Sequence, residues 1–303
     1  MKRILLSACF IMVFAFAEHN IKAQNKFSDD LYYNNKITYE FGGSVGIMNC
    51  LTDLGGNKGI GKKFIKDINL GNTQLSGSIF LSAAYKYALV LRGEATWGVV
   101  KASDAVLKNI KESTQGRYER NLSFRSLIFE ISIIGEIHPR FFITYTKQQE
   151  LPRLSPYLLG GIGYFTFNPQ AKLQGQLVDL RPLSTEGQGF EEYPNRKYYK
   201  LKQINLPVGA GLKYKYSENF NFSVECVYRF LSTDYLDDVS TTYIDKNLYN
   251  KYFTGQRLSE ALALNNRQKE INPNYTTNTN DIRGNPNNND AYFSINFKVG
   301  LIF

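Results

Sequence analysis

The sequence predicts an all-β fold, an eight-stranded antiparallel transmembrane β-barrel with long extracellular loops and short periplasmic turns. The first observation is that apolar residues alternate with mostly polar or small ones in residues 291–303, which end on Phe303. Because successive side chains of a strand point to opposite faces, this stretch has one apolar and one polar face, as in a strand that crosses the outer membrane. Seven further stretches alternate similarly, and the connections between the eight stretches are alternately long and shorter.

The first 23 residues are predicted to be a secretory signal peptide, so that the mature barrel domain comprises residues 24–303. Lys2 and Arg3 precede an apolar run from Ile4 to Ala17, and cleavage is expected after Ala23. The apolar run is too short for a membrane-spanning helix, and no later stretch has the long uncharged apolar run that such a helix needs. We therefore expect an exported protein that crosses the outer membrane of a Gram-negative bacterium with strands.

Composition and charge agree with this class of protein. Aromatic residues make up 14% of the chain, with 21 Tyr and 21 Phe, which suits the aromatic girdles of a barrel. The formal net charge of +9 falls to about +7 without the signal peptide. Because an exported protein seldom meets nucleic acid, this charge favours acidic lipopolysaccharide headgroups or an acidic protein as the partner.

The first four strands are predicted at residues 36–48, 74–87, 89–101 and 121–138, where every second residue is mostly apolar or aromatic. Their lipid-facing residues are expected to include Tyr39, Phe41, Ile79, Leu81, Leu91, Trp97, Ile131 and Ile133. The last four strands are predicted at 154–167, 203–216, 220–231 and 291–303. Their outward residues are expected to include Leu206, Val208, Phe222, Val224, Cys226 and Phe297. Gly160, Gly161 and Gly163 leave the faces of the fifth strand undetermined.

The connections are long after the first, third, fifth and seventh strands, at residues 49–73, 102–120, 168–202 and 232–290. They are shorter at Tyr87-Ala88, 139–153 and 217–219. Long loops outside and short turns in the periplasm place both termini in the periplasm. The glycines of 55–63 match neither a P-loop nor a dinucleotide fingerprint, so a phosphate cradle is not expected there.

The inward faces carry charges of both signs. The predicted interior network comprises Arg92, Glu94, Glu130, Glu225, Arg229 and Lys298, with Glu40, Glu136, Lys213 and Lys215 beside them. Two interpretations are open, a structural plug of paired charges and a path for protons or ions. Because side chains fill the interior of an eight-stranded barrel, we expect the plug.

Neither an enzyme nor a metal or cofactor site is predicted. The mature chain has one histidine, His138, and Ser132 and Glu136 share a strand face nearby. Ser132 and His138 are roughly 20 Å apart along an extended strand, too far for a catalytic pair, so His138 is expected to be a turn residue. Asp234, Asp237 and Asp238 could offer oxygens to Ca²⁺, but their spacing matches no standard calcium loop.

The two mature cysteines are not expected to pair with each other. Cys226 should face lipid in the middle of its strand, while Cys50 lies at the loop end of the first strand. A disulfide needs Cα atoms within about 7 Å, which this arrangement does not favour. We expect Cys226 to be reduced, and Cys50 to be free or cross-linked elsewhere.

Several motifs resemble a known family when they are taken together. In chain order they are Phe167-Asn168-Pro169-Gln170-Ala171, residues 180–189 (LRPLSTEGQG), residues 206–214 (LPVGAGLKY), residues 234–243 (DYLDDVSTTY), Arg283-Gly284-Asn285-Pro286 and Asp290. This set resembles the PorG-like family of outer-membrane barrels over almost the whole mature chain. The resemblance implies a non-enzymatic barrel of the type IX secretion system that associates with a periplasmic lipoprotein ring and supports protein export and, in some bacteria, gliding motility.

Two functions of different classes therefore remain open. One is a structural component of that secretion machine, and the other is a stand-alone barrel that binds envelope ligands or anchors the membrane. For the first, Arg140, Lys147 and Arg153 give the periplasmic connection 139–153 a positive excess that suits an acidic partner. In the last loop, Arg283 is expected to stabilise the loop through charge-assisted hydrogen bonds with Asp234, Asp237 and Asp238.

Overall fold

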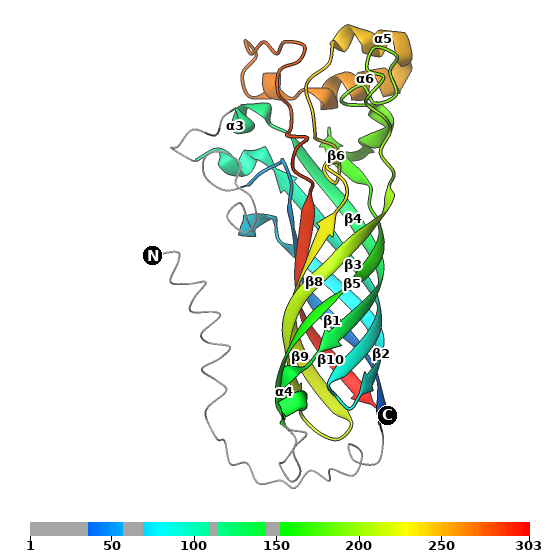
Figure 1. Cartoon of the computed structure of the whole chain (residues 1–303). Helices are drawn as coiled ribbons and strands as arrows, with labels where there is room; N and C mark the ends of the chain where they lie inside the picture. Colours follow the sequence, from blue (N-terminus) through cyan, green and yellow to red (C-terminus); the bar gives the residue numbers. More distant parts are fainter. Residues whose placement is uncertain (1–35, 57–68, 110–113, 115, 144–151) are drawn as a thin grey trace.

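Eight antiparallel strands close into a barrel in the computed structural model, which describes residues 36–56, 69–109, 114, 116–143 and 152–303 (Figure 1). The barrel strands are β1 (Ile37–Leu51), β2 (Gln74–Tyr85), β3 (Leu89–Ser103), β4 (Ser123–Ile137), β5 (Leu154–Thr166), β8 (Lys202–Lys215), β9 (Phe220–Leu231) and β10 (Ala291–Ile302). The predicted barrel and its eight strands are confirmed. The predicted signal peptide lies outside the described residues.

The barrel closes because its last strand pairs with its first. β10 pairs antiparallel with β1 from Glu40↔Ile302 to Leu51↔Ala291. Every other barrel strand pairs with the strand before and after it in this series, and β4 pairs with both β3 and β5. Closure leaves no edge strand among the eight strands of the barrel wall, so the backbone groups of the wall are paired, as a lipid environment requires.

The outer surface of the barrel is apolar. Side chains that the alternation assigned to lipid are exposed, among them Val45, Ile133 and Leu206, while their neighbours in sequence point inward. On β4 this apolar face runs from Leu127 to Ile137, and at a strand tilt near 40° it covers about 25 Å, the height of a lipid-facing band. The structure also settles the fifth strand: Leu158, Ile162 and Tyr164 face out, and Tyr157, Leu159 and Phe165 face in.

The two ends of the barrel differ in their connections. The short turns at Lys86-Tyr87 and at 216–219 lie at the same end as Phe303, and the long loops lie at the other end (Figure 1). We call these the periplasmic end and the outer end, by the rule for bacterial barrels. The connection 139–153 was predicted only as a shorter polar connection, and it begins with the short helix α4 (Pro139–Ile143), which starts on the proline that a first helical turn tolerates.

The loop 168–202 contains a β-hairpin that the sequence analysis did not predict. β6 (Pro169–Leu173) and β7 (Gln176–Asp179) are joined by Gln174-Gly175, both of which have positive φ, as a type I′ turn requires. β6 continues the sheet beyond β5, because Gln170 and Pro169 pair with Arg125 and Ser126 of β4.

The fourth loop, 232–290, connects β9 to β10 as predicted, and it contains short helices that the sequence analysis did not predict. They are η5 (Lys246–Leu248), α5 (Tyr249–Tyr252), α6 (Gly255–Asn265) and η6 (Gln268–Glu270). The other short helices of the outer end are η2 (Leu70–Asn72), η3 (Asp104–Leu107), α3 (Arg117–Arg120) and η4 (Arg181–Leu183). Among the described residues, no helix is both long and apolar enough to cross a membrane.

The third and fourth loops, residues 167–201 and 232–290, pack together into a folded unit that we call the loop cap (Figure 1). Its buried side chains include Leu183, Phe190, Tyr199, Leu236, Tyr249, Phe253 and Leu264. This cluster is continuous with Phe165 and Tyr292 inside the barrel mouth. The barrel and the loop cap therefore share one core, which fixes the cap on the barrel.

Candidate functional site

The periplasmic half of the barrel interior is organised around Arg92 of β3. Its guanidinium forms buried ion pairs with three carboxylates: Glu94 at 2.9 Å, Glu225 at 3.1 Å, and Glu136. Lys298 of β10 joins the same group, with its Nζ 2.6 Å from Glu94 and 2.9 Å from Glu225. Each charge thus has a partner of opposite sign, which is the condition for keeping it buried.

The outer half is organised around Glu130 of β4. Arg229 Nε lies 2.9 Å from Glu130 Oε2, and the same carboxylate accepts hydrogen bonds from Tyr292 Oη at 2.5 Å and Asn205 Nδ2 at 2.6 Å. Arg229 also donates to Ser294 Oγ at 2.8 Å. Four strands are tied together by this one buried carboxylate.

Glycines make room for large side chains in the interior. Tyr157 of β5 lies over Gly211, its register partner on β8, and a Cβ at position 211 would collide with the Tyr157 ring. From that position Tyr157 Oη donates to Glu225 Oε2 at 3.0 Å. Phe80 lies over Gly42 in the same way. The described interior is therefore filled by interlocking side chains, in the manner of a plug.

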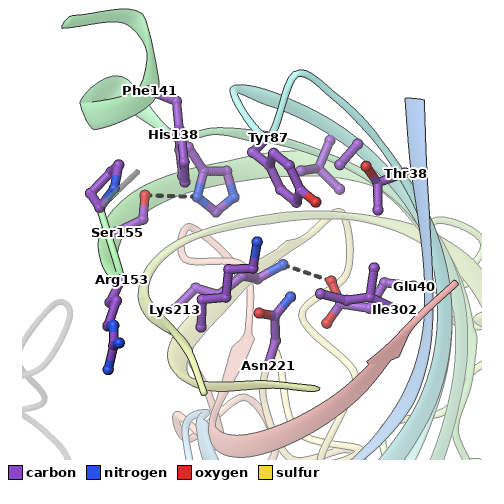
Figure 2. Close-up of a pocket in the computed structure, with 14 residues that line it drawn as sticks. Thr38, Glu40, Tyr87, His138, Phe141, Arg153, Ser155, Lys213, Asn221 and Ile302 are labelled. Atoms are coloured by element: carbon purple, nitrogen blue, oxygen red, sulfur yellow. Dashed lines mark hydrogen bonds and ion pairs between the residues drawn. The ribbon is translucent and has the colours of Figure 1, made fainter. Parts of the chain in front are cut away.

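At the periplasmic end the interior contains a cavity of about 30 Å³, shown in Figure 2. Lys213 Nζ reaches across it to Glu40 Oε2 at 3.0 Å, and His138 Nδ1 lies 3.1 Å from Ser155 Oγ. Phe141 of α4 packs against His138 at a centroid distance of 6.2 Å. A cavity of this size can hold water but no organic substrate.

His138 lies in the connection between β4 and α4, as predicted, but its side chain is buried in the barrel rather than part of an exposed turn. It is 1% exposed, its Nε2 lies 3.1 Å from Glu136 Oε2, and its ring stacks on Tyr157. Ser155, His138 and Glu136 therefore form a serine–histidine–carboxylate chain, in which the serine differs from the Ser132 considered above. All three residues are buried, and Glu136 also pairs with Arg92. Because the space beside Ser155 among the described residues is only the cavity of about 30 Å³, we interpret this chain as an extension of the interior network.

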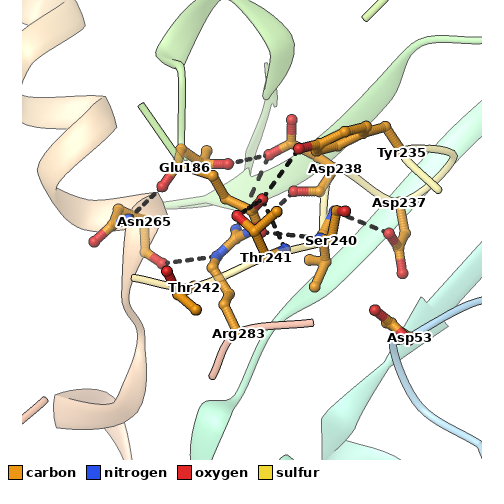
Figure 3. A network of polar contacts seen from close by, with 12 residues as sticks. Asp53, Glu186, Tyr235, Asp237, Asp238, Ser240, Thr241, Thr242, Asn265 and Arg283 are labelled. Carbon is orange, nitrogen blue, oxygen red and sulfur yellow. Dashed lines mark hydrogen bonds and ion pairs between the residues drawn. The ribbon is translucent and has the colours of Figure 1, made fainter. Parts of the chain in front are cut away.

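The loop cap is held by a second buried network, centred on Glu186 and Arg283 (Figure 3). Arg283 Nη1 lies 2.8 Å from Glu186 Oε1 and donates to the Asp238 carbonyl oxygen at 2.7 Å. Glu186 also accepts from the backbone N–H groups of Ser240 at 2.9 Å and Thr241 at 3.0 Å. Because these charge-assisted bonds join the third loop to the fourth, they fix the shape of the cap.

Asp238 has a separate set of partners in this network. Its carboxylate accepts from Thr185 Oγ1 at 2.5 Å and Tyr199 Oη at 2.6 Å, whereas Arg283 Nη2 is 4.0 Å from it. Burial raises the pKa of the Asp238 carboxyl to about 6, against the opposing effect of Arg283. Asp238 has a positive φ of 67°, which Asp tolerates better than most residues.

Asp237 and Asp234 do not contact Arg283 as predicted. Asp237 accepts hydrogen bonds from the backbone N–H groups of Leu54 at 3.1 Å and Val239 at 2.9 Å. It belongs to a group of acidic side chains with Asp53, Asp234 and Asp290, which influence one another's pKa values. Burial raises the pKa of Asp237 to about 8 and that of Asp234 to about 9, and it also raises that of Asp290. The physical reason is burial beside like charges.

This acidic group lies where the first loop meets the fourth, beside a cavity of about 940 Å³ that Asp53, Asp290 and Arg120 help to line. Arg120 pairs with Asp104, with Nε 2.8 Å from Asp104 Oδ2, and its Nη2 donates to the Asp53 carbonyl oxygen at 2.7 Å. No group of three or more His, Cys, Asp or Glu side chains placed to hold a metal ion occurs among the described residues.

The residues predicted to contact a partner lie at the periplasmic rim. Arg140 is exposed on α4, and its Nη1 donates to the Leu154 carbonyl at 3.0 Å. Arg153 is partly exposed just before β5 and lines the periplasmic cavity (Figure 2). Lys147 lies outside the described residues. The rim is thus positively charged at two described positions beside α4.

The two cysteines that the structure describes, Cys50 and Cys226, are both free. Cys226 is exposed on the lipid-facing surface of β9, where the alternation placed it. Cys50 is buried at the outer end of β1, with its thiol 3.6 Å from the Lys101 carbonyl oxygen.

Sequence reasoning missed several residues of these networks. Ser155 and Tyr157 gave no usable signal, because the faces of β5 were undetermined. His138 was considered, but its partner Ser155 was not identified. Glu186 stands in the LRPLSTEGQG motif, where it is the single acidic residue, and this was the sign that could have identified it.

Several barrels of known structure match this chain over most of its length and most of theirs. No protein-family model and no curated protein matches the chain. Neisserial surface protein A matches with a TM-score of 0.38 and 9% identity, Ail of Yersinia pestis with 0.35 and 8%, and the N-terminal barrel domain of Pseudomonas aeruginosa OprF with 0.33 and 10%. Each match covers 88% of this chain and 97% of the other chain. At these scores the matches carry no argument about function, and the assignment as a small outer-membrane β-barrel rests on the strand pairing and the apolar outer surface.

Proposed function

We propose that the protein is a non-enzymatic outer-membrane anchor that docks the periplasmic lipoprotein ring of a type IX secretion system and so supports protein export. The observation that carries the proposal is the filled interior, in which Arg92 and Glu130 organise buried charges across the whole barrel. A barrel plugged in this way does not act as a conduit, so its function lies at its rims. The ordered motifs that resemble the PorG-like family indicate which machine the rim serves.

The periplasmic rim offers the docking surface in this proposal. Arg140 projects from α4 beside Arg153, and Lys147 belongs to the same connection. A positive rim attracts an acidic partner face and determines the orientation of docking more than its strength. The partner expected here is therefore an acidic surface of a ring component.

The test is a triple charge reversal, Arg140→Glu with Lys147→Glu and Arg153→Glu, in the tagged full-length protein. A matched control reverses three exposed lysines of the loop cap, Lys197, Lys246 and Lys269, to Glu. We expect the rim variant to reach the outer membrane normally but to recover less ring protein on purification, while the control recovers as much as wild type. Normal recovery and normal export by the rim variant would overturn the docking surface.

A second function, a stand-alone barrel that binds envelope ligands, is favoured by the folded loop cap. The cap has its own buried ion pair and apolar core, which a barrel that serves only as a periplasmic anchor does not need. If no ring component co-purifies with wild-type protein even at low salt, this function becomes the better explanation. A folded cap displayed at the outer end would then be the recognition surface.

A further inference from the structure

Basic side chains gather on one side of the barrel, immediately beyond the apolar band at the outer end. They belong to β3, β4, β6, β8 and the residues before β8. We call this set the basic arc: Lys101, Arg125, Lys172, Lys200 and Lys202. Lys101 and Arg125 stand on the outward faces of their strands, because Ala102 and Phe124 beside them are buried.

The position of the arc follows from the strand register. Val99 and Leu127 form an apolar cross-strand pair, and two residues further along the strands the next outward pair is Lys101↔Arg125. Likewise Tyr164 pairs with Ile204, and two residues further Thr166 pairs with Lys202. Two residues correspond to about 7 Å along a strand, so the cationic groups stand at the boundary between acyl chains and headgroups.

These cations lack the partners that the interior cations have. Among the residues that the structure describes, none of the five takes part in an ion pair. The carboxylate of the neighbouring hairpin, Asp179, accepts hydrogen bonds from Asn168 at 3.0 Å and Gln170 at 2.7 Å. Two like charges opposite each other on neighbouring strands, as at Lys101 and Arg125, destabilise a sheet unless an anion lies between them.

Within the part of the chain that the structure describes, the arc is confined to one side. At the outer ends of β9 and β10 the outward positions carry uncharged residues: Phe230, Ser232 and Phe293. If these basic residues served only solubility, they would be spread around the whole barrel rather than gathered on one side of it. The asymmetry therefore indicates a ligand that sits in the plane of the outer leaflet against β3, β4, β6 and β8.

We infer that the basic arc binds the phosphate groups of an acidic glycolipid of the outer leaflet, with the acyl chains lying on the apolar faces of β3 and β4. A lipid fits better than a soluble protein because the arc is continuous with the lipid-facing surface at Val99 and Leu127. Arg125 can hold a phosphate with two parallel N–H bonds, and Lys101 adds a second positive charge to the same group.

The chain contains a built-in reporter of this binding. Trp97, the single tryptophan of the sequence, faces outward on β3, four residues from Lys101 on the same face. At about 13 Å along the strand from Lys101, it lies where the acyl chains of the bound lipid would lie. Its fluorescence therefore reports locally on the proposed site.

The experiment titrates Trp97 emission of the folded full-length mature protein, in detergent, with bis-phosphorylated lipid A. The Lys101→Gln/Arg125→Gln/Lys202→Gln variant is compared with Lys197→Gln/Lys246→Gln/Lys269→Gln, which removes equal charge from the loop cap. We expect the arc variant to bind about tenfold more weakly than wild type, from the loss of charge-assisted contacts, and the control to bind as wild type does. Equal affinity of all three proteins would overturn the inference.

Two further probes distinguish the source of the phosphate. Dephosphorylated lipid A should bind far more weakly, and inorganic phosphate should not displace bound lipid A at equal concentration. Equal binding of the dephosphorylated lipid would overturn a phosphate site, and full displacement by inorganic phosphate would overturn a lipid site. If the triple variant does not fold, as judged by its heat-dependent gel mobility, the single variants Lys101→Gln and Lys202→Gln serve, each with an intermediate loss expected.

Discussion

Arg283 and Glu186, 97 residues apart in the sequence, form a buried ion pair of 2.8 Å that joins the fourth loop to the third. Neither side chain is a barrel residue, and both are almost fully buried. The pair makes the loop cap depend on contacts between two loops and gives it a stability that can be measured apart from that of the barrel.

Replacing Arg283 with Met should unfold the loop cap locally without opening the barrel. Removal of one partner leaves Glu186 buried and unpaired, which costs about 3–5 kcal/mol. Limited proteolysis of the outer loops should then be faster, while heat-dependent gel mobility of the barrel stays normal. Arg257→Met, a change at an exposed arginine of α6, is the control. Equal protease resistance of the two variants would contradict the role of Arg283.

The acidic group at the junction of the first and fourth loops should make the loop cap more stable at low pH. The pKa values of Asp237 and Asp234 are raised to about 8 and about 9 in the folded protein, so the folded state holds protons that the unfolded loops release near pH 4. Stability is therefore full below pH 4 and falls as the pH rises toward 9. Hydrogen exchange of the loop amides across this range measures the effect.

The Asp237→Asn variant tests whether Asp237 contributes to this pH dependence of the stability of the loop cap. Leu54 N–H and Val239 N–H donate to different oxygens of Asp237, so the single amide oxygen of Asn can replace one of these acceptors, and the amide carries no charge. We expect the variant to be more protected than wild type at pH 9 and to show a shallower pH dependence. An unchanged slope would mean that Asp237 does not contribute to it.

Arginine substitutions at two adjacent positions of β9 should have different effects, because one side chain faces lipid and the other faces the barrel interior. Val224 faces lipid between Leu212 and Phe297, and Ser223 faces the filled interior. Val224→Arg should lower the free energy of unfolding by about 2–4 kcal/mol if it lies near the midplane. Ser223→Arg should act by crowding the interior network, and lipid thickness should not alter its effect. Urea titrations in bilayers of two thicknesses make the comparison, and identical behaviour would contradict the register.

Deletion of Phe303 should impair barrel assembly. The Phe303 N–H donates to the Tyr39 carbonyl at 3.0 Å, and the two rings stack at a centroid distance of 6.2 Å. The deletion removes the last contacts that close β10 on β1, where unpaired backbone groups are costly in lipid. Outer-membrane levels should fall, and Phe303→Tyr should restore them. Normal levels of the deletion would show that the terminal residue is dispensable.

The sequence by itself determined the barrel wall. Alternation with a period of two is a local property, so residues such as Val45 and Glu40 could be assigned to opposite faces before their partners were known. The strand count and the alternating loop lengths followed from the same pattern. Only the faces of β5 could not be assigned in this way, because its glycines have no side chain that would distinguish the two faces.

Only the tertiary structure showed which residues pair inside the barrel and how the loops pack together at the outer end. Pairing of Arg92 with three carboxylates, burial of His138, and the join between Arg283 and Glu186 all depend on residues far apart in sequence that register brings together. The helices of the fourth loop were missed because their apolar residues are scattered within a polar segment and acquire a core only against the third loop. The alternation within a strand determines which face of the strand a side chain points to. Which residue it contacts depends on the register between strands that are far apart in the sequence.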